Sequence, residues 1–414
     1  MDSRPIAPPP ASELSDRQVP QVGHHLDGKR IALMVTGGIA AMKTPFIARA
    51  LRRYGADVVA FASEEGLRYV AEEALAWATV HPVITRLTAA AEHLSDDAPF
   101  DAYLVAPATY NTLNKMAYGI ADTPVTTALA SAIGRMERGG TKVLVAPTMH
   151  GTLHNAILTE GLERLERLGV RVIPPREDYG KHNIPENEVL VAEVIRAVSA
   201  SPLRGRPVLV TGGPTPVPLD SVRRLTNRFR GRLGIEIARE LFLRGAEVLL
   251  IHGDGAHPAP IELPHRVVRT YDEYRAAVDD ELRSRPYEAG VFSAAVADYQ
   301  PAEVAEGKIP SGQALTLELV PTAKVIDEVR AAHPALHMVT FKYQEKISHG
   351  DLMRIARKRL ERFEAVVANR GEETGPEGEQ VAWLLDRDDE PRRILGKQLI
   401  AAAIAEHLET SLGA

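Results

Sequence analysis

The chain has 414 residues, a formal net charge of −6 and no cysteine. Its length predicts two or three domains, its 45% apolar fraction is enough for a core, and its charge makes nucleic acid a poor candidate partner. No apolar run approaches the roughly 18 residues of a membrane span, so we expect no membrane segment and a cytoplasmic location. Without cysteine, disulfides, thiolate zinc sites and cysteine nucleophiles are excluded.

Residues 1–28 are rich in proline and polar residues and contain no hydrophobic signal core. We expect a disordered arm rather than a targeting peptide. His24 and His25 are interpreted as bystanders in this arm, and the sequence leaves any metal ligands unknown.

Strand and helix patterns then alternate over residues 29–196. Apolar runs predict strands, and the first helix pattern has apolar residues at helical spacing from Ile39 to Leu51. The strands are expected at 30–37, 57–62, 102–108, 142–148 and 170–175. Such alternation predicts a parallel sheet covered by helices on both faces.

Residues 197–206 have the composition of a linker, and the alternation restarts over 207–414. Strictly alternating LTLELV (315–320) predicts a half-exposed strand, and 399–408 predicts a closing helix. The fold class is therefore α/β, with two doubly wound, Rossmann-like domains and mainly parallel sheets.

Both domains open with a strand that runs into Thr-Gly-Gly, at 36–38 and 211–213. A glycine turn before a helix can bind phosphate, but neither copy matches the dinucleotide or P-loop pattern, and a tight turn without ligand is the alternative. Pro214, Pro216 and Pro218 follow the second copy, so we expect an extended loop there and a helix only from about Leu233.

Longer motifs carry a family resemblance. TGGIAAMK (36–43), APATYNTLNKMAYGIADTPVTT (106–127) and APTMH (146–150) resemble the flavin-dependent cysteine decarboxylases of coenzyme A synthesis. VTGGPTPVPLDSVRRLTN (210–227), FSAAVADYQP (292–301) and GKIP (307–310) resemble phosphopantothenate–cysteine ligase. Together, over roughly residues 29–409, they resemble the bifunctional phosphopantothenoylcysteine decarboxylase/phosphopantothenate–cysteine ligases.

The resemblance implies an FMN site in the first domain. Ser63 matches a hydroxyl near the FMN phosphate, although a serine there also caps a helix. His93 matches the active-site histidine, whose ordinary pKa suits it to accept a substrate proton. The FMN residues that the resemblance implies are Gly37, Gly38, Ile39, Ser63, Pro107, Thr109, Asn111 and Asp122.

Two departures affect the decarboxylase. The family's flap, with its cysteine, corresponds to residues 175–186, which contain none, and its Pro-Ala-Met-Asn reads Pro-Thr-Met149-His150. His150 can still donate to a substrate carboxylate. Three outcomes stay open: Asp178, Tyr179 or His182 supplies the missing proton, the reaction stops at an oxidised ene-thiol, or the domain holds flavin without decarboxylating.

For the second domain the resemblance implies ligation of 4′-phosphopantothenate and cysteine through an acyl-nucleotide, with Mg²⁺. Asn227 and Lys308 match catalytic positions. The nucleotide-side positions are Gly212, Gly213, Ala295, Asp298, Lys324, Phe341 and Lys342. TFK (340–342) and PTAKVI (321–326) depart from the bacterial motifs, so CTP and ATP both stay open, and the two lysines face either a triphosphate or solvent.

The leading hypothesis is thus a two-domain enzyme of coenzyme A synthesis. The alternatives are a ligase joined to an oxidative flavin decarboxylase that ends at an ene-thiol, and a non-catalytic flavin-binding scaffold or regulatory subunit. The resemblance implies homo-oligomers, with trimers of flavin domains that complete the FMN site, dimers of ligase domains and a possible dodecamer.

Overall fold

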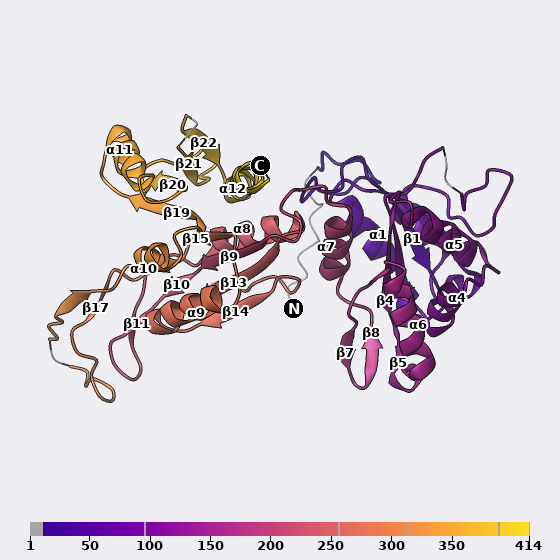
Figure 1. Cartoon of the computed structure of the whole chain (residues 1–414), viewed down its shortest axis with the longest axis horizontal. Helices are drawn as coiled ribbons and strands as arrows, with labels where there is room; N and C mark the ends of the chain where they lie inside the picture. The colour runs from indigo at the N-terminus through magenta and orange to yellow at the C-terminus, as the bar shows by residue number, and fades with distance from the viewer. Residues whose placement is uncertain (1–10, 95–96, 256, 313, 388–389, 414) are drawn as a thin grey trace, which may run out of the picture. The chain divides into compact units, whose positions relative to one another are not determined.

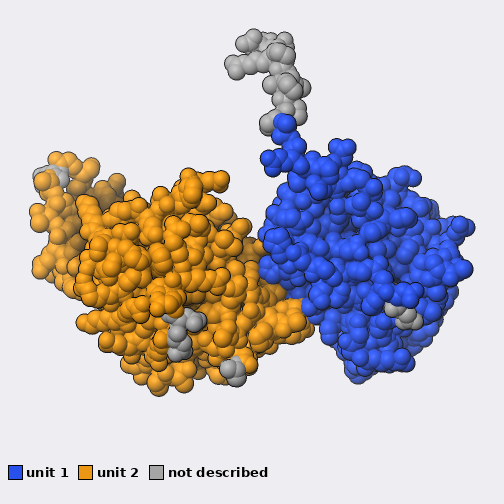
Figure 2. All heavy atoms as spheres, turned by 90° about the horizontal axis from the view of Figure 1, so that it is seen from above, with its two compact units in different colours: residues 1–198 blue, residues 199–414 orange. Residues whose placement is uncertain are grey.

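A computed structural model of the chain describes residues 11–94, 97–255, 257–312, 314–387 and 390–413. The chain divides into two compact units, Met1–Val198 and Ser199–Ala414, which Figure 2 shows in different colours. The division falls inside the stretch expected to be a linker. Each unit has its own mainly parallel sheet, so the predicted fold class is confirmed.

The first unit contains a parallel sheet with strand order β2-β1-β3-β4-β6. β3 is buried along its whole length because helices cover both faces of the sheet, which explains its uninterrupted apolar sequence. The strands are β1 (Arg30–Val35), β2 (Asp57–Ala62), β3 (Ala102–Ala108), β4 (Lys142–Pro147) and β6 (Arg171–Val172).

The helices of this unit form two packed groups. α1 contacts α3 and α7, and α4 contacts α5 and α6. The helices are η1 (Ile39–Lys43), α1 (Thr44–Arg52), α2 (Glu64–Leu67), α3 (Glu72–Thr79), α4 (Tyr110–Tyr118), α5 (Pro124–Met136), η2 (Gly151–Leu153), α6 (Ala156–Arg167) and α7 (Asn187–Val198).

Two expectations for the first unit need correction. The helical pattern after β1 is split into η1 and α1, and Ile39, Met42 and Phe46 are exposed rather than packed on the sheet. The segment expected to be a disordered arm is partly packed: Leu26 is fully buried, and its N–H donates to the Tyr54 carbonyl. Residues 1–10 of that segment lie outside the described residues.

The second unit has a larger sheet in the order β14-β13-β9-β15-β19-β20-β21-β22, parallel as far as β20. Its strands are β9 (Pro207–Gly212), β13 (Glu247–Gly253), β14 (His265–Val268), β15 (Ala289–Phe292), β19 (His337–Gln344), β20 (Ala365–Arg370), β21 (Val381–Leu385) and β22 (Arg392–Leu395). Its helices are α8 (Arg232–Leu243), α9 (Tyr271–Ser284), α10 (Val325–Ala332), α11 (His349–Arg359) and α12 (Lys397–Leu412).

Short strand pairs replace a helix after the second Thr-Gly-Gly. Because the three prolines cannot continue a helix, the chain stays extended until α8 begins at Arg232, and the expected delay of the helix is confirmed. The pairs are β10 (Pro214–Thr215) with β16 (Ala295–Val296), β11 (Val217–Pro218) with β12 (Arg224–Leu225), and β17 (Tyr299–Pro301) with β18 (Leu319–Pro321). The prediction of a strand over residues 315–320 was wrong for residues 315–318, because the strand β18 begins only at Leu319.

Candidate active sites of the two units

The glycine turn of the first unit meets the ends of β1, β2 and β3. The buried Thr36 hydroxyl donates to the Pro107 carbonyl at 2.7 Å and lies 3.5 Å from the Thr109 hydroxyl. Gly38 has a φ of 153°, and a Cβ atom built there would lie 3.6 Å from the Thr109 methyl group. Thr36 was not predicted as a site residue, although the Thr-Gly-Gly motif contains it.

Helix N-termini surround this turn. Ser63 caps α2 by accepting from the Gly66 N–H at 3.1 Å, so the capping interpretation of this serine holds. Thr109 caps α4 in the same way. A Cβ atom on Gly37 would lie 2.7 Å from Cβ of Glu65 and requires that residue to shift, so the turn needs glycine. Hydroxyls, glycine backbone and helix termini at one sheet edge form a cradle that fits a phosphate-bearing cofactor.

Three further residues implied for the flavin site are less closely joined to this cradle. Asn111 is exposed in the first turn of α4, and Asp122 lies beyond the far end of that helix, about 13 Å along its axis. Asp122 pairs with Lys115 at 2.7 Å, and this hydrogen bond lowers the pKa of Asp122 below its usual range. His93 is half-buried in a turn, and its Nδ1 has no hydrogen-bond partner among the described residues.

The segment that corresponds to the family's flap is a hairpin. β7 (Arg176–Asp178) and β8 (Lys181–Asn183) pair with each other, and β8 also pairs with β5 (Met149–His150) (Figure 1). Tyr179 is 90% exposed at the hairpin turn, whereas the His182 side chain is only 16% exposed.

Two histidines meet on this small sheet. Nε2 of His182 lies 2.6 Å from Nδ1 of His154, so one ring donates a proton to the other. The Glu177 carboxylate lies 3.9 Å from Nδ1 of His182. His150 is exposed, and its Nδ1 accepts from the Thr152 N–H at 3.2 Å, while Met149 belongs to the hydrophobic core.

The hairpin is close to the flavin cradle because β5 directly follows β4. The Thr148 N–H donates to the Ala108 carbonyl at 3.0 Å, at the end of β3. The Tyr110 hydroxyl, beside Thr109, donates to the Asn155 side chain at 3.4 Å, and Asn155 follows His154. The His154–His182 pair therefore lies at the same sheet edge as the cradle.

In the second unit, Asn227 is bound to the AAVAD segment, which in turn contacts the glycine turn. Its side-chain nitrogen donates to the carbonyls of Ala295 and Val296, both at 3.0 Å. The Ala295 N–H donates to the Gly213 carbonyl at 2.9 Å. These contacts bring Gly213, Asn227 and Ala295 together at the carboxyl end of β9.

Basic groups lie beside this arrangement. The Lys324 ammonium forms an ion pair with the Asp298 carboxylate, so these two predicted nucleotide-site residues are adjacent. Burial lowers the pKa of Lys342, and the nearby charges of Arg359 and Lys324 lower it further. The Arg359 guanidinium donates to the Phe341 carbonyl at 2.7 Å. Arg359 was not predicted, because no local pattern separates it from the other basic residues of α11.

Lys308 is exposed in a separate loop that Asp220 anchors. The Asp220 carboxylate accepts from the N–H groups of Val222, Arg223 and Ile309 at 2.8, 2.6 and 3.1 Å. Burial alone disfavours its charge, but these bonds and the Arg223 guanidinium lower the pKa of Asp220 to about 2. Asp220 was also not predicted as a site residue. The sequence around it indicated only a turn.

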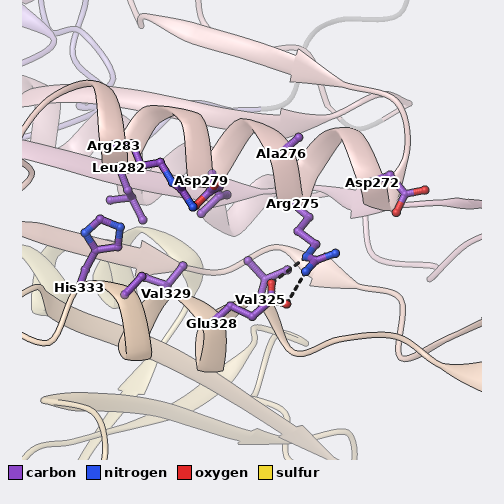
Figure 3. A pocket seen from close by; sticks show the side chains of 12 residues that line it. Asp272, Arg275, Ala276, Asp279, Leu282, Arg283, Val325, Glu328, Val329 and His333 are labelled. Atoms are coloured by element: carbon purple, nitrogen blue, oxygen red, sulfur yellow. Dashed lines mark hydrogen bonds and ion pairs between the residues drawn. The ribbon is translucent and has the colours of Figure 1, made fainter.

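A cavity of about 470 Å³ lies between α9 and α10 (Figure 3). Arg275 of α9 and Glu328 of α10 pair beside it at 2.6 and 2.8 Å. None of the residues predicted for the nucleotide site lines this cavity. It lies between helices that pack on the sheet, so it is distinct from the site at the strand ends.

The described residues contain no group of three or more histidine, aspartate and glutamate side chains arranged to hold a metal ion. In the same part of the chain, no helix combines the length and apolar character needed to cross a membrane.

Family models identify the class to which these two units belong. The flavoprotein family model matches residues 20–199. The model of the DNA/pantothenate metabolism flavoprotein C-terminal domain matches residues 203–412. A flavoprotein unit is therefore followed by a pantothenate-metabolism unit.

Whole-length relatives have the same order of units. The coenzyme A biosynthesis bifunctional protein CoaBC of Thermococcus kodakarensis is 39% identical, over 88% of this chain and 90% of that protein. The proteins of that name from Mycolicibacterium smegmatis and Escherichia coli K12 are 33% and 31% identical, covering 87% and 74% of this chain and 92% and 77% of theirs. The chain belongs to this family of bifunctional coenzyme A biosynthesis enzymes, with a decarboxylase-type flavoprotein half and a ligase half. These comparisons favour neither alternative, the decarboxylase that ends at an ene-thiol or the non-catalytic scaffold.

Proposed function

We propose that the second unit ligates 4′-phosphopantothenate to cysteine, and that the first unit decarboxylates the product to 4′-phosphopantetheine. The observation that carries the proposal is the double hydrogen bond of Asn227 to Ala295 and Val296. It fixes Asn227 on the AAVAD segment, whose Ala295 N–H donates to Gly213 of the glycine turn, and it leaves the side-chain oxygen of Asn227 available to a ligand.

In the ligase half, the substrate carboxylate attacks the α-phosphate of CTP or ATP, and pyrophosphate leaves. The cysteine amine then attacks the acyl-nucleotide, so that an amide forms and the nucleoside monophosphate leaves. Such steps depend on positioning and charge neutralisation. Asn227 orients the acyl-nucleotide, Lys308, Lys324 and Lys342 offset the phosphate charge, and Mg²⁺ accompanies the nucleotide.

In the flavin half, Gly38, Ser63 and Thr109 would hold FMN by its phosphate, and Asn111 would be a further contact of the cofactor. When bound, FMN supplies the two-electron oxidation of the substrate thiol end and the reverse reduction. His93 takes a proton from the substrate. The substrate carboxylate then leaves as carbon dioxide, and its bonding electron pair stays in an ene-thiol.

Completing the reaction requires two electrons from the reduced flavin and a proton for the ene-thiol. We assign this proton to His182, because it is the least exposed of the three candidates in the hairpin and His154 is bonded to it. Asp178 and Tyr179 are exposed to solvent. The second candidate function, release of the oxidised ene-thiol, is favoured by the absence of cysteine from the whole sequence.

One assay separates these functions. The purified protein is first examined for flavin absorbance. It is then incubated with 4′-phosphopantothenate, cysteine, Mg²⁺ and either CTP or ATP, and the masses of the products are measured by mass spectrometry. We expect 4′-phosphopantetheine with one of the nucleotides. A product lighter by two hydrogens supports the ene-thiol function, and a condensed product that keeps its carboxyl group indicates ligase activity alone. Absence of any condensed product with both nucleotides contradicts the ligase proposal.

The assay also tests the proton assignment. His182→Gln should convert the product to the ene-thiol, while Tyr179→Phe at the exposed hairpin turn should leave it unchanged. If His182→Gln still yields 4′-phosphopantetheine at the wild-type rate, the assignment is wrong.

We further propose that the protein is cytoplasmic and forms homo-oligomers. In these assemblies, trimers of flavin domains complete the FMN site and ligase domains form dimers, which together make a dodecamer.

A further inference from the structure

A buried histidine of the ligase half has an unused nitrogen. His252, near the end of β13, is 3% exposed, and its Nε2 donates to the His257 carbonyl at 2.7 Å. The proton on Nε2 leaves a lone pair on Nδ1 in the neutral ring. Nδ1 is buried and has no hydrogen-bond partner in the described part of the chain.

The edge of the ring that carries Nδ1 faces Gly212, which was predicted for the nucleotide site, and Gly231, which was not. A Cβ atom built on Gly212 would lie 3.4 Å from Nδ1. One built on Gly231 would lie 3.0 Å from the neighbouring Cε1 atom and 2.5 Å from the backbone of Gly213. The imidazole therefore packs directly against the turn at Gly212, and the Gly231 position has no room for a side chain.

The same place is the N-terminus of α8. Gly231 is the N-cap, with a φ of 74°, and no side chain in the described chain caps this 12-residue helix. The N–H groups of its first turn and its positive dipole end favour an anion. The His257 N–H donates to the Arg230 carbonyl at 3.0 Å, so the segment that contacts His252 also fixes the approach to this helix.

We propose that a phosphate group of the nucleotide binds at the N-terminus of α8, and that His252 takes up a proton at Nδ1 when it binds. The proposal rests on the nucleotide-dependent ligation proposed above. The bound anion lies close to the ring, and little water separates the two. The negative charge therefore stabilises the imidazolium strongly.

The surroundings of the ring favour the neutral form before binding. Burial lowers the pKa of His252 below its ordinary value, and the neighbouring His265 and His257 lower it further. β9 and the N-cap of α8 meet the ring with Gly212 and Gly231. Because phosphate binding takes up a proton, the affinity falls as the pH rises. The fall is up to about tenfold per pH unit in the range between the pKa of His252 in the free protein and its pKa in the bound protein.

Calorimetry tests this coupling in the full chain. Pyrophosphate with Mg²⁺ is titrated from pH 6 to 8 in two buffers of different ionisation enthalpy, and CTP and ATP are titrated in parallel without the acyl substrate. Protonation of the probe itself is common to all variants, so the readout is the difference between proteins. We expect the wild type to take up close to one proton more than His252→Gln, with an affinity that falls more steeply with pH.

His257→Gln and His265→Gln are the matched controls, because both side chains are exposed and the His257 contact uses only its backbone carbonyl. Both controls should keep the extra proton uptake. Equal uptake in the wild type and in folded His252→Gln, or loss of the extra uptake in both controls, overturns the proposal.

Histidine NMR on the unmodified protein gives a test that does not depend on a variant. The C2 proton of His252 should shift toward the imidazolium position when pyrophosphate is added near neutral pH, and an unchanged signal at saturation contradicts the proposal.

A separate assay of ligation distinguishes failure of this proposal from failure of the proposed ligase function. If the wild type forms condensed product but shows no proton uptake, the inference about His252 fails alone. If it shows uptake but forms no product with either nucleotide, the ligase proposal fails alone.

Discussion

At the scale of single residues, Asp220 shows how one carboxylate can fix the loop that carries Lys308. It accepts N–H groups from its own turn and from Ile309, which is distant in sequence and adjacent to Lys308. The Arg223 guanidinium donates both to Asp220 and to the Ile309 carbonyl, at 2.9 and 3.0 Å. The position of Lys308 therefore depends on a residue that does not contact substrate.

Asp220→Asn should reduce the ligase kcat by roughly 10- to 100-fold, because an amide cannot accept at both oxygen positions and a small displacement of a catalytic group is costly. Steady-state kinetics should show a smaller effect on the KM for cysteine than on kcat. Asp279→Asn, in an exposed i,i+4 pair on α9, is the control and should be close to wild type. An unchanged kcat in folded Asp220→Asn would falsify this role.

At the scale of elements, α8 starts at a glycine that has no room for a side chain. Gly231→Ala should raise the KM for the nucleotide and lower Tm, because the left-handed N-cap costs an alanine about 1–2 kcal/mol and its Cβ would press on Gly213. Gly134→Ala, inside α5 with open space around it, should instead stabilise the protein by about 0.5–1 kcal/mol. Thermal unfolding and nucleotide titrations of the two variants compare them directly.

The closing helix α12 is joined to the sheet by a pair of histidines. Nε2 of His337, at the start of β19, lies 3.0 Å from Nε2 of His407 on α12. Burial and the neighbouring His407 lower the pKa of His337 to about 4, although Glu364 opposes the shift. The unfolded chain then binds a proton more readily than the folded one, so this contribution to stability is complete above pH 6.5 and is lost as the pH falls toward 4.

We therefore expect the free energy of unfolding of the wild type to fall by about 2 kcal/mol more than that of His337→Gln between pH 6.5 and pH 4. Denaturant titrations at several pH values measure the difference. His333→Gln, at the end of α10, is the matched control and should keep the wild-type slope. Parallel pH profiles for the wild type and His337→Gln would contradict the assignment.

At the scale of the whole molecule, the first unit exposes two different apolar surfaces. One consists of Ile39, Met42 and Phe46 on η1 and α1. The other lies around α4 and α6 and consists of Tyr118, Ile120, Leu153 and Ile157. A closed ring with head-to-tail contacts needs two distinct surfaces of this kind, so they support the proposed trimer.

Replacing Met42 and Phe46 together with serine should convert the assembly into smaller species, because each interface would lose apolar area. Light scattering after size-exclusion chromatography measures the mass. Val304→Ser, at an exposed position in the second unit, should leave the mass unchanged. An assembly of wild-type mass in the double variant would exclude this surface from the contact.

Much of the fold could be predicted because buried parallel strands such as β3 and β9 are continuous apolar runs, and glycine and proline mark where they end. The helical pattern from Ile39 to Leu51 predicted the helical period correctly but not which side is exposed, because an exposed apolar residue such as Ile39 has the same spacing as a core residue. Motifs located Asn227 and Ala295, which the structure joins. Asp220, His154 and His252 could not be found, since their partners come from distant segments or from backbone atoms.

The division of the chain after Val198 has a consequence for how the two reactions can be studied. Each sheet is complete within its own unit, so a substitution that inactivates one half leaves the other half able to work. Two preparations, each inactive in a different half, should then restore the complete conversion when mixed, provided that the intermediate is released into solution. Failure to restore it, with each remaining activity intact, would mean that the intermediate passes between halves of the same assembly without mixing with the bulk.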